Sequence, residues 1–112
     1  MKQFFTFMLL LLIGSSAVAQ MAHPGKLSGV LRDSLTTAPV GYANAVLKEG
    51  DKLITGTAAD NEGKFELANL PLGSYTLELT FLGYSPKKLP IILTAEKPVL
   101  ELGRILLTSD SK

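Results

Sequence analysis

The sequence has no cysteine, no tryptophan and a single histidine, His23. The absence of cysteine excludes disulfide bonds, a thiol nucleophile and cysteine-ligated zinc. A histidine acting as a catalytic base near neutral pH would have to be His23, which lies beside Pro24 in a short leader before the first expected strand. We therefore expect no catalytic residue, no metal site and no cofactor, and we predict that the chain is not an enzyme.

Clustered positive charge is also missing. The chain has 11 Lys+Arg against 10 Asp+Glu, and Lys87-Lys88 is its only adjacent basic pair. Proteins that bind nucleic-acid backbones group lysines and arginines on one face. We expect no nucleic-acid partner.

The N-terminus has the pattern of an export signal. Lys2 supplies a positive charge, residues 4–13 form an apolar run broken only by a threonine, and residues 17–19 are the small-x-small tripeptide that a signal peptidase accepts. The run is shorter than the roughly 18 apolar residues of a permanent transmembrane helix. We predict a signal peptide at 1–19, a leader at 20–25 and an exported mature domain without a transmembrane segment.

From Lys26 onward, apolar residues recur at every second position in short runs divided by turn residues, which is typical of β-strands. The clearest run places Tyr75, Leu77, Leu79 and Phe81 on one face. Short strands spaced by turns predict an all-β, seven-stranded antiparallel sandwich. The seven expected strands cover residues 26–32, 42–48, 53–59, 64–67, 75–81, 87–93 and 100–107.

The last two expected strands carry irregularities. Residues 87–93 begin with two lysines and contain Pro90, features of an edge strand protected against pairing with other chains. In the final strand Gly103 interrupts the alternation, which indicates a bulge. Residues 108–112 are polar and patternless, so we expect a frayed end or the start of a linker.

The stretch from Asp60 to Gly63 predicts a tight turn. The Asp60 carboxylate can accept backbone N–H groups, and Gly63 can adopt a positive φ. The acids also suggest a calcium loop superficially, but the following Lys64 and Phe65 do not continue the alternating ligands of an EF-hand. A simple turn is the favoured interpretation.

Glu66 and Glu78 raise the hypothesis of a carboxylate pair for glycoside hydrolysis. Both fall on the polar faces of alternating strands, which favours solvated surface positions. Phe65 and Tyr75 are in phase with the expected core, as is Phe81 at the end of its strand. Candidate contact residues on the surface are Tyr42, Tyr84, Lys87 and Lys88, with packing of the two tyrosines on loops as the alternative.

Several short motifs occur together. An apolar-x-Gly-x-apolar-x-Asp strand at 27–33 precedes a Thr-x-x-Pro loop at 36–39, and a Tyr-Ala-Asn-Ala-Val strand begins at residue 42. Asp-x-x-Gly-x-Phe and Leu-Pro-x-Gly-x-Tyr motifs follow at 60–65 and 70–75. This combination resembles the carboxypeptidase regulatory-like domain, a transthyretin-like sandwich with a carbohydrate-binding-like fold. The motif residues that the resemblance places in structural roles are Gly29, Asp33, Asp60, Gly63, Phe65, Pro71, Gly73 and Tyr75.

The resemblance also implies a setting. In metallocarboxypeptidases this domain follows a catalytic zinc domain, whereas here it follows the expected signal peptide directly. That arrangement is similar to the N-terminus of TonB-dependent outer-membrane receptors, in which a linker, a plug and a barrel come next. It implies a non-enzymatic periplasmic accessory domain, associated with the outer membrane, whose partner is the plug and barrel or another periplasmic protein.

One other interpretation stays open, and a second is set aside. A free-standing exported binding module, with carbohydrate as its ligand, fits the fold and the two candidate tyrosines, although the lack of tryptophan weakens it. A transthyretin-like hydrolase would require the catalytic histidines and the C-terminal signature of that family, which the sequence lacks.

Overall fold

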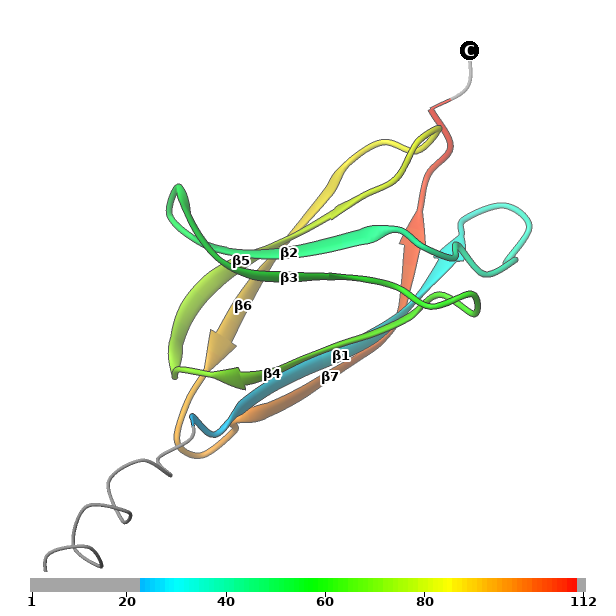
Figure 1. Cartoon of the computed structure of the whole chain (residues 1–112). Helices are drawn as coiled ribbons and strands as arrows, with labels where there is room; N and C mark the ends of the chain where they lie inside the picture. Colours follow the sequence, from blue (N-terminus) through cyan, green and yellow to red (C-terminus); the bar gives the residue numbers. More distant parts are fainter. Residues whose placement is uncertain (1–22, 111–112) are drawn as a thin grey trace, which may run out of the picture.

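The computed structural model describes residues 23–110, so the expected signal peptide at 1–19 and the first part of the expected leader lie outside the described residues. Seven strands form two sheets packed face to face, which confirms the predicted all-β sandwich (Figure 1). No helix among residues 23–110 is long and apolar enough to cross a membrane. The strands are β1 (Gly25–Asp33), β2 (Asn44–Glu49), β3 (Lys52–Ala58), β4 (Lys64–Leu70), β5 (Gly73–Thr80), β6 (Lys87–Leu93) and β7 (Val99–Leu107).

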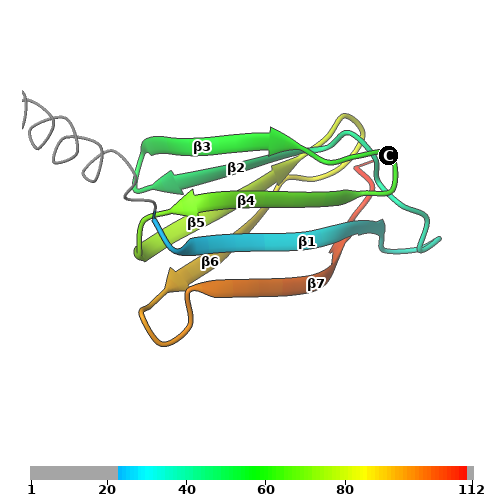
Figure 2. The same cartoon turned by 60° about the horizontal axis from the view of Figure 1, so that its bottom comes forward.

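The strand order is β4-β1-β7 in one sheet and β3-β2-β5-β6 in the other (Figure 2). Neighbouring strands pair antiparallel except β1 and β7, which run parallel from Lys26 opposite Val99 to Asp33 opposite Leu107. The expectation of a purely antiparallel sandwich is therefore corrected for this pair. The reason is topological. The turn after β6 connects the four-stranded sheet to the three-stranded sheet, where β7 pairs with the side of β1 that β4 leaves free.

Strict alternation of side chains builds the core between the sheets. Along β5, Tyr75, Leu77 and Leu79 are buried while the residues between them are half-buried. Each fully buried leucine stabilises the fold by about 1.5–3 kcal/mol relative to exposure. The buried apolar residues are Leu27, Leu31, Val40, Ala43, Ala45, Leu47, Ala59, Phe65, Leu67, Leu70, Tyr75, Leu77, Leu79, Ile91, Leu93, Ile105 and Leu107.

Two strand boundaries differ from the sequence prediction. Strand β5 ends at Thr80, so Phe81 lies beyond the sheet and is 37% exposed instead of completing the core face. Strand β4 continues past residue 67 to Leu70, although Asn69 and Leu70 were expected in a turn. Asn69 adopts a φ of 56°, which asparagine tolerates better than most residues. The buried Leu70 then anchors the end of the strand in the core.

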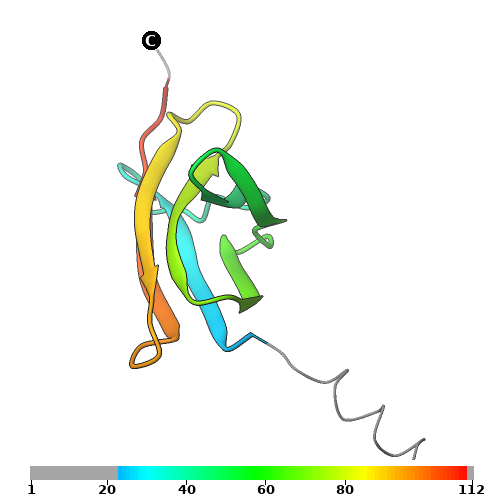
Figure 3. The same cartoon turned by 90° about the vertical axis from the view of Figure 1, so that its left-hand side faces the viewer.

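The edge and bulge predictions are confirmed. Strand β6 is an edge of the four-stranded sheet, where Pro90 lies opposite Thr76. Strand β7 slips by one residue against β1 between Ser28 and Val30, and Gly103 in this stretch has a φ of 68°. The view in Figure 3 shows β6 and β7 running along one side of the sandwich.

The polar C-terminal stretch is more ordered than expected. The Ser85 N–H donates to the Thr108 carbonyl oxygen at 2.9 Å, and the Asp110 N–H donates to that of Gly83 at 2.8 Å. These bonds hold residues 108–110 against the turn between β5 and β6. The expectation of a frayed end or linker from residue 108 is corrected for these three residues, because their polar side chains gave no sign of backbone pairing.

Candidate functional site

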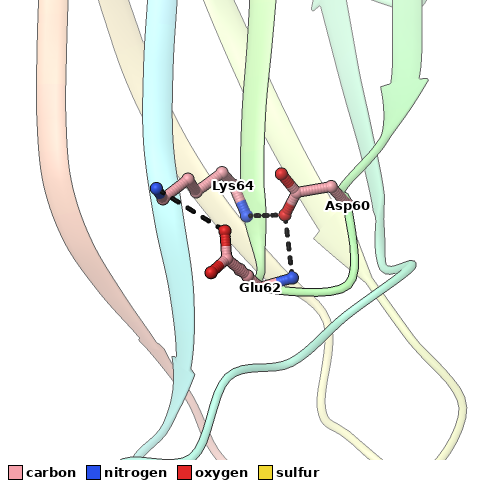
Figure 4. A network of polar contacts seen from close by, with 3 residues as sticks. All are labelled: Asp60, Glu62 and Lys64. Atoms are coloured by element: carbon pink, nitrogen blue, oxygen red, sulfur yellow. Dashed lines mark hydrogen bonds and ion pairs between the residues drawn. The ribbon is translucent and has the colours of Figure 1, made fainter.

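The turn between β3 and β4 is built around the Asp60 carboxylate (Figure 4). Its Oδ1 accepts the backbone N–H groups of Glu62 and Lys64, both at 2.9 Å. Gly63 has a φ of 83° and is buried. The Glu62 carboxylate meets the Lys64 ammonium group at 3.7 Å on the surface. The turn prediction is confirmed, and no group of three or more His, Cys, Asp or Glu residues within 23–110 is arranged to hold a metal.

A second polar network joins the β1–β2 loop to the β5–β6 turn. Asp33 Oδ1 accepts the N–H groups of Leu35 at 2.8 Å and Thr36 at 3.0 Å, and its Oδ2 accepts the Tyr84 hydroxyl at 2.7 Å. These bonds favour the charged carboxylate, the Thr36 N–H most strongly, and lower the pKa of Asp33 to about 2. The bond to Asp33 also raises the pKa of Tyr84.

The remaining motif residues shape the core. Gly29 is buried on β1, where an added Cβ would lie 2.9 Å from the Phe65 ring and 3.0 Å from Ile105 Cδ1. A larger residue would therefore displace Phe65, which is itself buried on β4.

The Pro71–Tyr75 part of the motif ties a turn to β5. Pro71 is exposed in the turn after β4, Gly73 opens β5, and the Tyr75 hydroxyl donates to the Pro71 carbonyl oxygen. Burial, with a smaller contribution from the nearby charge of Glu49, raises the pKa of Tyr75. The Tyr75 hydroxyl group therefore has a hydrogen-bond acceptor within the fold.

The four candidate contact residues have different environments. Tyr42 is 65% exposed and Lys88 is exposed, so both are accessible. Tyr84 is half-buried and bonded to Asp33, which fits the alternative that this tyrosine packs on a loop. Lys87 reaches across from β6 to donate its ammonium group to the Leu106 carbonyl oxygen on β7 at 3.0 Å. Of the four, Tyr42 and Lys88 are therefore free to contact a partner, while Tyr84 and Lys87 already make contacts within the domain.

The carboxylates considered for glycoside hydrolysis do not converge. Glu66 lies on β4 and pairs with Lys26 at 3.2 Å, while Glu78 lies on β5 in the other sheet and pairs with Lys48 at 3.0 Å. His23, which precedes β1, is exposed. This geometry contains no acid–base pair directed at a common substrate position.

Two concave regions occur on the surface of the described domain. One of about 520 Å³ lies over the three-stranded sheet and is lined by Val30, Lys64, Glu66 and Glu101 among others. The other, of about 380 Å³, lies between β6 and β7. Both are shallow surface hollows, and neither contains the carboxylate pair discussed above.

Sequence reasoning named Tyr42 as a contact residue but missed the other exposed apolar residues of the loops at the same end. Leu35 is 85% exposed in the β1–β2 loop, and Leu82 is 93% exposed in the β5–β6 turn. These loops lie at the same end of the sandwich, where the chain also ends (Figure 2). We call Leu35, Tyr42, Phe81 and Leu82 the apolar tips. The available signal was a pair of large apolar or aromatic residues within each of the two loops, Leu35 and Tyr42 in one and Phe81 and Leu82 in the other.

Tyr42 at this end also has an unusual backbone. Its φ is 65°, a conformation that costs a residue with a side chain roughly 1 kcal/mol or more. Its N–H donates to the carbonyl oxygens of Ala59 at 3.1 Å and Asp60 at 3.3 Å, which holds it in place. The strained backbone thus fixes an aromatic ring in an exposed position.

Comparison with known proteins identifies a matching family and solved structures with a similar fold. Residues 26–105 match the family described as the carboxypeptidase regulatory-like domain. No curated protein matches the chain. Among solved structures, 5-hydroxyisourate hydrolase of Klebsiella pneumoniae superimposes with a TM-score of 0.61 at 16% identity, over 78% of this chain and 92% of that one.

Two further solved bacterial structures are also similar. The major pilin subunit BcpA of Bacillus cereus gives a TM-score of 0.66 at 16% identity, over 77% of this chain, and the chain spans 30% of the pilin. A cohesin–X-dockerin complex of Acetivibrio cellulolyticus gives 0.56 at 24% identity, over 74% of this chain and 56% of that one. At these identities the likeness shows a shared fold.

Proposed function

Because the chain belongs to the carboxypeptidase regulatory-like domain family, we propose that it is a non-enzymatic, exported accessory domain that works by protein contact. The observation that carries this proposal is the exposure of the apolar tips at one end of the sandwich. Large exposed apolar side chains that share one end of a domain are candidates for an interaction surface. The separated, ion-paired Glu66 and Glu78 support the non-enzymatic part.

We further propose that the domain is the periplasmic N-terminal part of a TonB-dependent outer-membrane receptor, with the plug and barrel as its partner. The predicted signal peptide at 1–19 supports export. The Asp110 N–H donates to the Gly83 carbonyl oxygen, so residue 110 lies beside the β5–β6 turn and a following segment would emerge near the apolar tips. Sequencing the coding frame beyond Lys112 tests this proposal: plug and barrel sequence is expected, and an immediate native stop codon would remove it.

Photo-crosslinking in exporting cells tests the contact surface. With a photoreactive amino acid at Leu82, mass spectrometry of the digested receptor is expected to find this position joined to a peptide of the plug or barrel. The matched control is the same amino acid at Ile92, which is 62% exposed on β6, away from the apolar tips. Equal crosslinking from both positions, or none from Leu82, would contradict the proposed surface.

A carbohydrate-binding module is the second candidate, and the exposed, backbone-strained Tyr42 favours it. Exposed aromatic rings offer a flat apolar surface to sugars. Isothermal titration with a panel of oligosaccharides would show heats that disappear in Tyr42→Ala if this function holds. Flat heats for the wild-type protein would eliminate it.

A further inference from the structure

Four strands lie at sheet edges, and three of them carry features that hinder pairing with another chain. Strand β6 has Pro90, and β7 has the bulge at Gly103 and the Lys87 ammonium group on the Leu106 carbonyl. Strand β4 has a charged outer face and the positive φ of Asn69. Charges, prolines and bulges are the usual protection of edge strands.

Strand β3 lacks this protection over most of its length. Residues 53–58, Leu-Ile-Thr-Gly-Thr-Ala, contain no charge and no proline, and the register irregularity against β2 is confined to the start of the strand. Leu53 is 62% exposed, and Ile54 packs only partly against the core. An uncharged, partly apolar edge of this kind is a template for strand addition.

The backbone groups of this edge are available. The Ala59 N–H donates to the Ala43 carbonyl at 2.8 Å, so residue 59 faces β2. Because successive residues of a strand point their N–H and C=O groups to opposite sides, those of Gly56 and Ala58 face away from β2. Of these outward groups, the Ala58 carbonyl oxygen accepts the Thr57 hydroxyl at the long distance of 3.5 Å.

The Lys52 ammonium group at the start of the edge and the carboxylates beyond its end are complementary in charge. Lys52 follows the exposed Asp51 and forms no ion pair with any described residue. Asp60 and Glu62 lie in the turn just beyond the end of β3, where Glu62 also meets the Lys64 ammonium group at 3.7 Å. Asp60 uses only Oδ1 to accept the turn N–H groups, so its Oδ2 points away from them (Figure 4). In an antiparallel pair of identical strands, the start of each lies beside the end of the other.

We propose that β3 is the edge through which two copies of this chain pair, antiparallel and two-fold symmetric, joining their four-stranded sheets into one. Each Lys52 then meets the acidic turn of the second copy, so the pairing gains two complementary charge contacts. Thr55 and Thr57 bring matching hydroxyl side chains to the shared face, where cross-strand threonine pairs stabilise sheets. The inference is independent of the receptor proposal.

Sedimentation equilibrium of residues 23–112, which contain all seven strands and the complete core, tests the pairing. A reversible dimer is expected for the wild type. Lys52→Glu or Glu62→Lys alone should weaken dimerisation about tenfold, since each replaces two attractions by repulsions. The double variant, which exchanges the two charges, should return to within about threefold of the wild type.

The matched control is Lys97→Glu, the same charge change in an exposed turn between β6 and β7. It should leave the dimer unchanged, and circular dichroism should show that all variants stay folded, because every substituted side chain is exposed. A monomer at all concentrations up to about 1 mM would overturn the proposal. A Lys52→Glu effect equal to that of Lys97→Glu, or no recovery in the double variant, would do the same.

Discussion

At the scale of single residues, Gly63 is a position where we expect substitution to be poorly tolerated. Its φ of 83° suits glycine, and an added Cβ would lie 2.4 Å from the Leu31 carbonyl oxygen. We expect Gly63→Ala to lower the free energy of unfolding by about 1–3 kcal/mol from backbone strain, and further from this collision. Urea denaturation of Gly63→Ala and Gly83→Ala separates the two causes, since Gly83 has a φ of 89° with open space around it. Equal losses of unfolding free energy in the two variants would contradict a contribution from the collision with the Leu31 carbonyl oxygen.

The ionisation of Asp33 makes the free energy of unfolding depend on pH. Its pKa is about 2 in the folded protein against 3.8 normally, so the folded state favours the charged carboxylate. The resulting stabilisation is fully present above pH 3.8 and is lost as the pH falls through about 2. We expect wild type to be more stable than Asp33→Asn at pH 7, with the difference shrinking between pH 4 and 2. Denaturant titrations at several pH values in this range measure the difference in unfolding free energy. The Tyr84→Phe variant shows how much of that difference comes from the hydrogen bond between the Tyr84 hydroxyl and Asp33.

At the scale of elements, the β3–β4 turn depends on one carboxylate oxygen. Asp60→Ala removes the acceptor of two backbone N–H groups and should cost about 1–3 kcal/mol of stability. Asp60→Asn keeps an oxygen at this position and should recover much of the loss. Glu62→Gln should change stability by less than about 1 kcal/mol, because its ion pair is exposed. Thermal unfolding compares the three, and a loss in Glu62→Gln equal to that in Asp60→Ala would argue against the turn bonds.

The elements also show which features local sequence could predict. The Asp60 turn depends on residues within five positions, so residue types were sufficient. Tyr84 bonds to Asp33, 51 residues away, and no local pattern indicates that partner. Phe81 continued the alternation although the chain had already left the sheet, since periodicity does not mark where pairing stops. The Thr108 bond is made by backbone, on which side-chain types carry little information.

At the scale of the whole molecule, both sheets share one core, so we expect a single unfolding transition. Leu77 is fully buried on β5, and Leu77→Ala should cost about 2–5 kcal/mol through lost contacts and a cavity. Ile92→Ala, at an exposed position on β6, should change stability by roughly 0.5 kcal/mol or less. Denaturation followed by circular dichroism and tyrosine fluorescence checks both the losses and the coincidence of the transitions.

Strand order is also a whole-molecule property. Alternation identified which face of each strand is buried, but it says nothing about which strand lies beside which. The antiparallel neighbours β2–β3 and β5–β6 are consecutive along the chain and follow from short connections. The pairing of the first strand with the last is not consecutive, and only the three-dimensional closure of the two sheets determines it.

That parallel pairing sets how the domain would respond to force. The chain enters β1 at one end of the sandwich and leaves β7 at the other, about 30 Å away along nine-residue strands. Tension applied to the two ends would pull β1 and β7 in opposite directions along their length. The hydrogen bonds between them would then bear the load together in shear instead of opening one after another. We therefore expect the fold to resist stretching between its two ends more strongly than it would resist a force that separates β1 from β7 sideways.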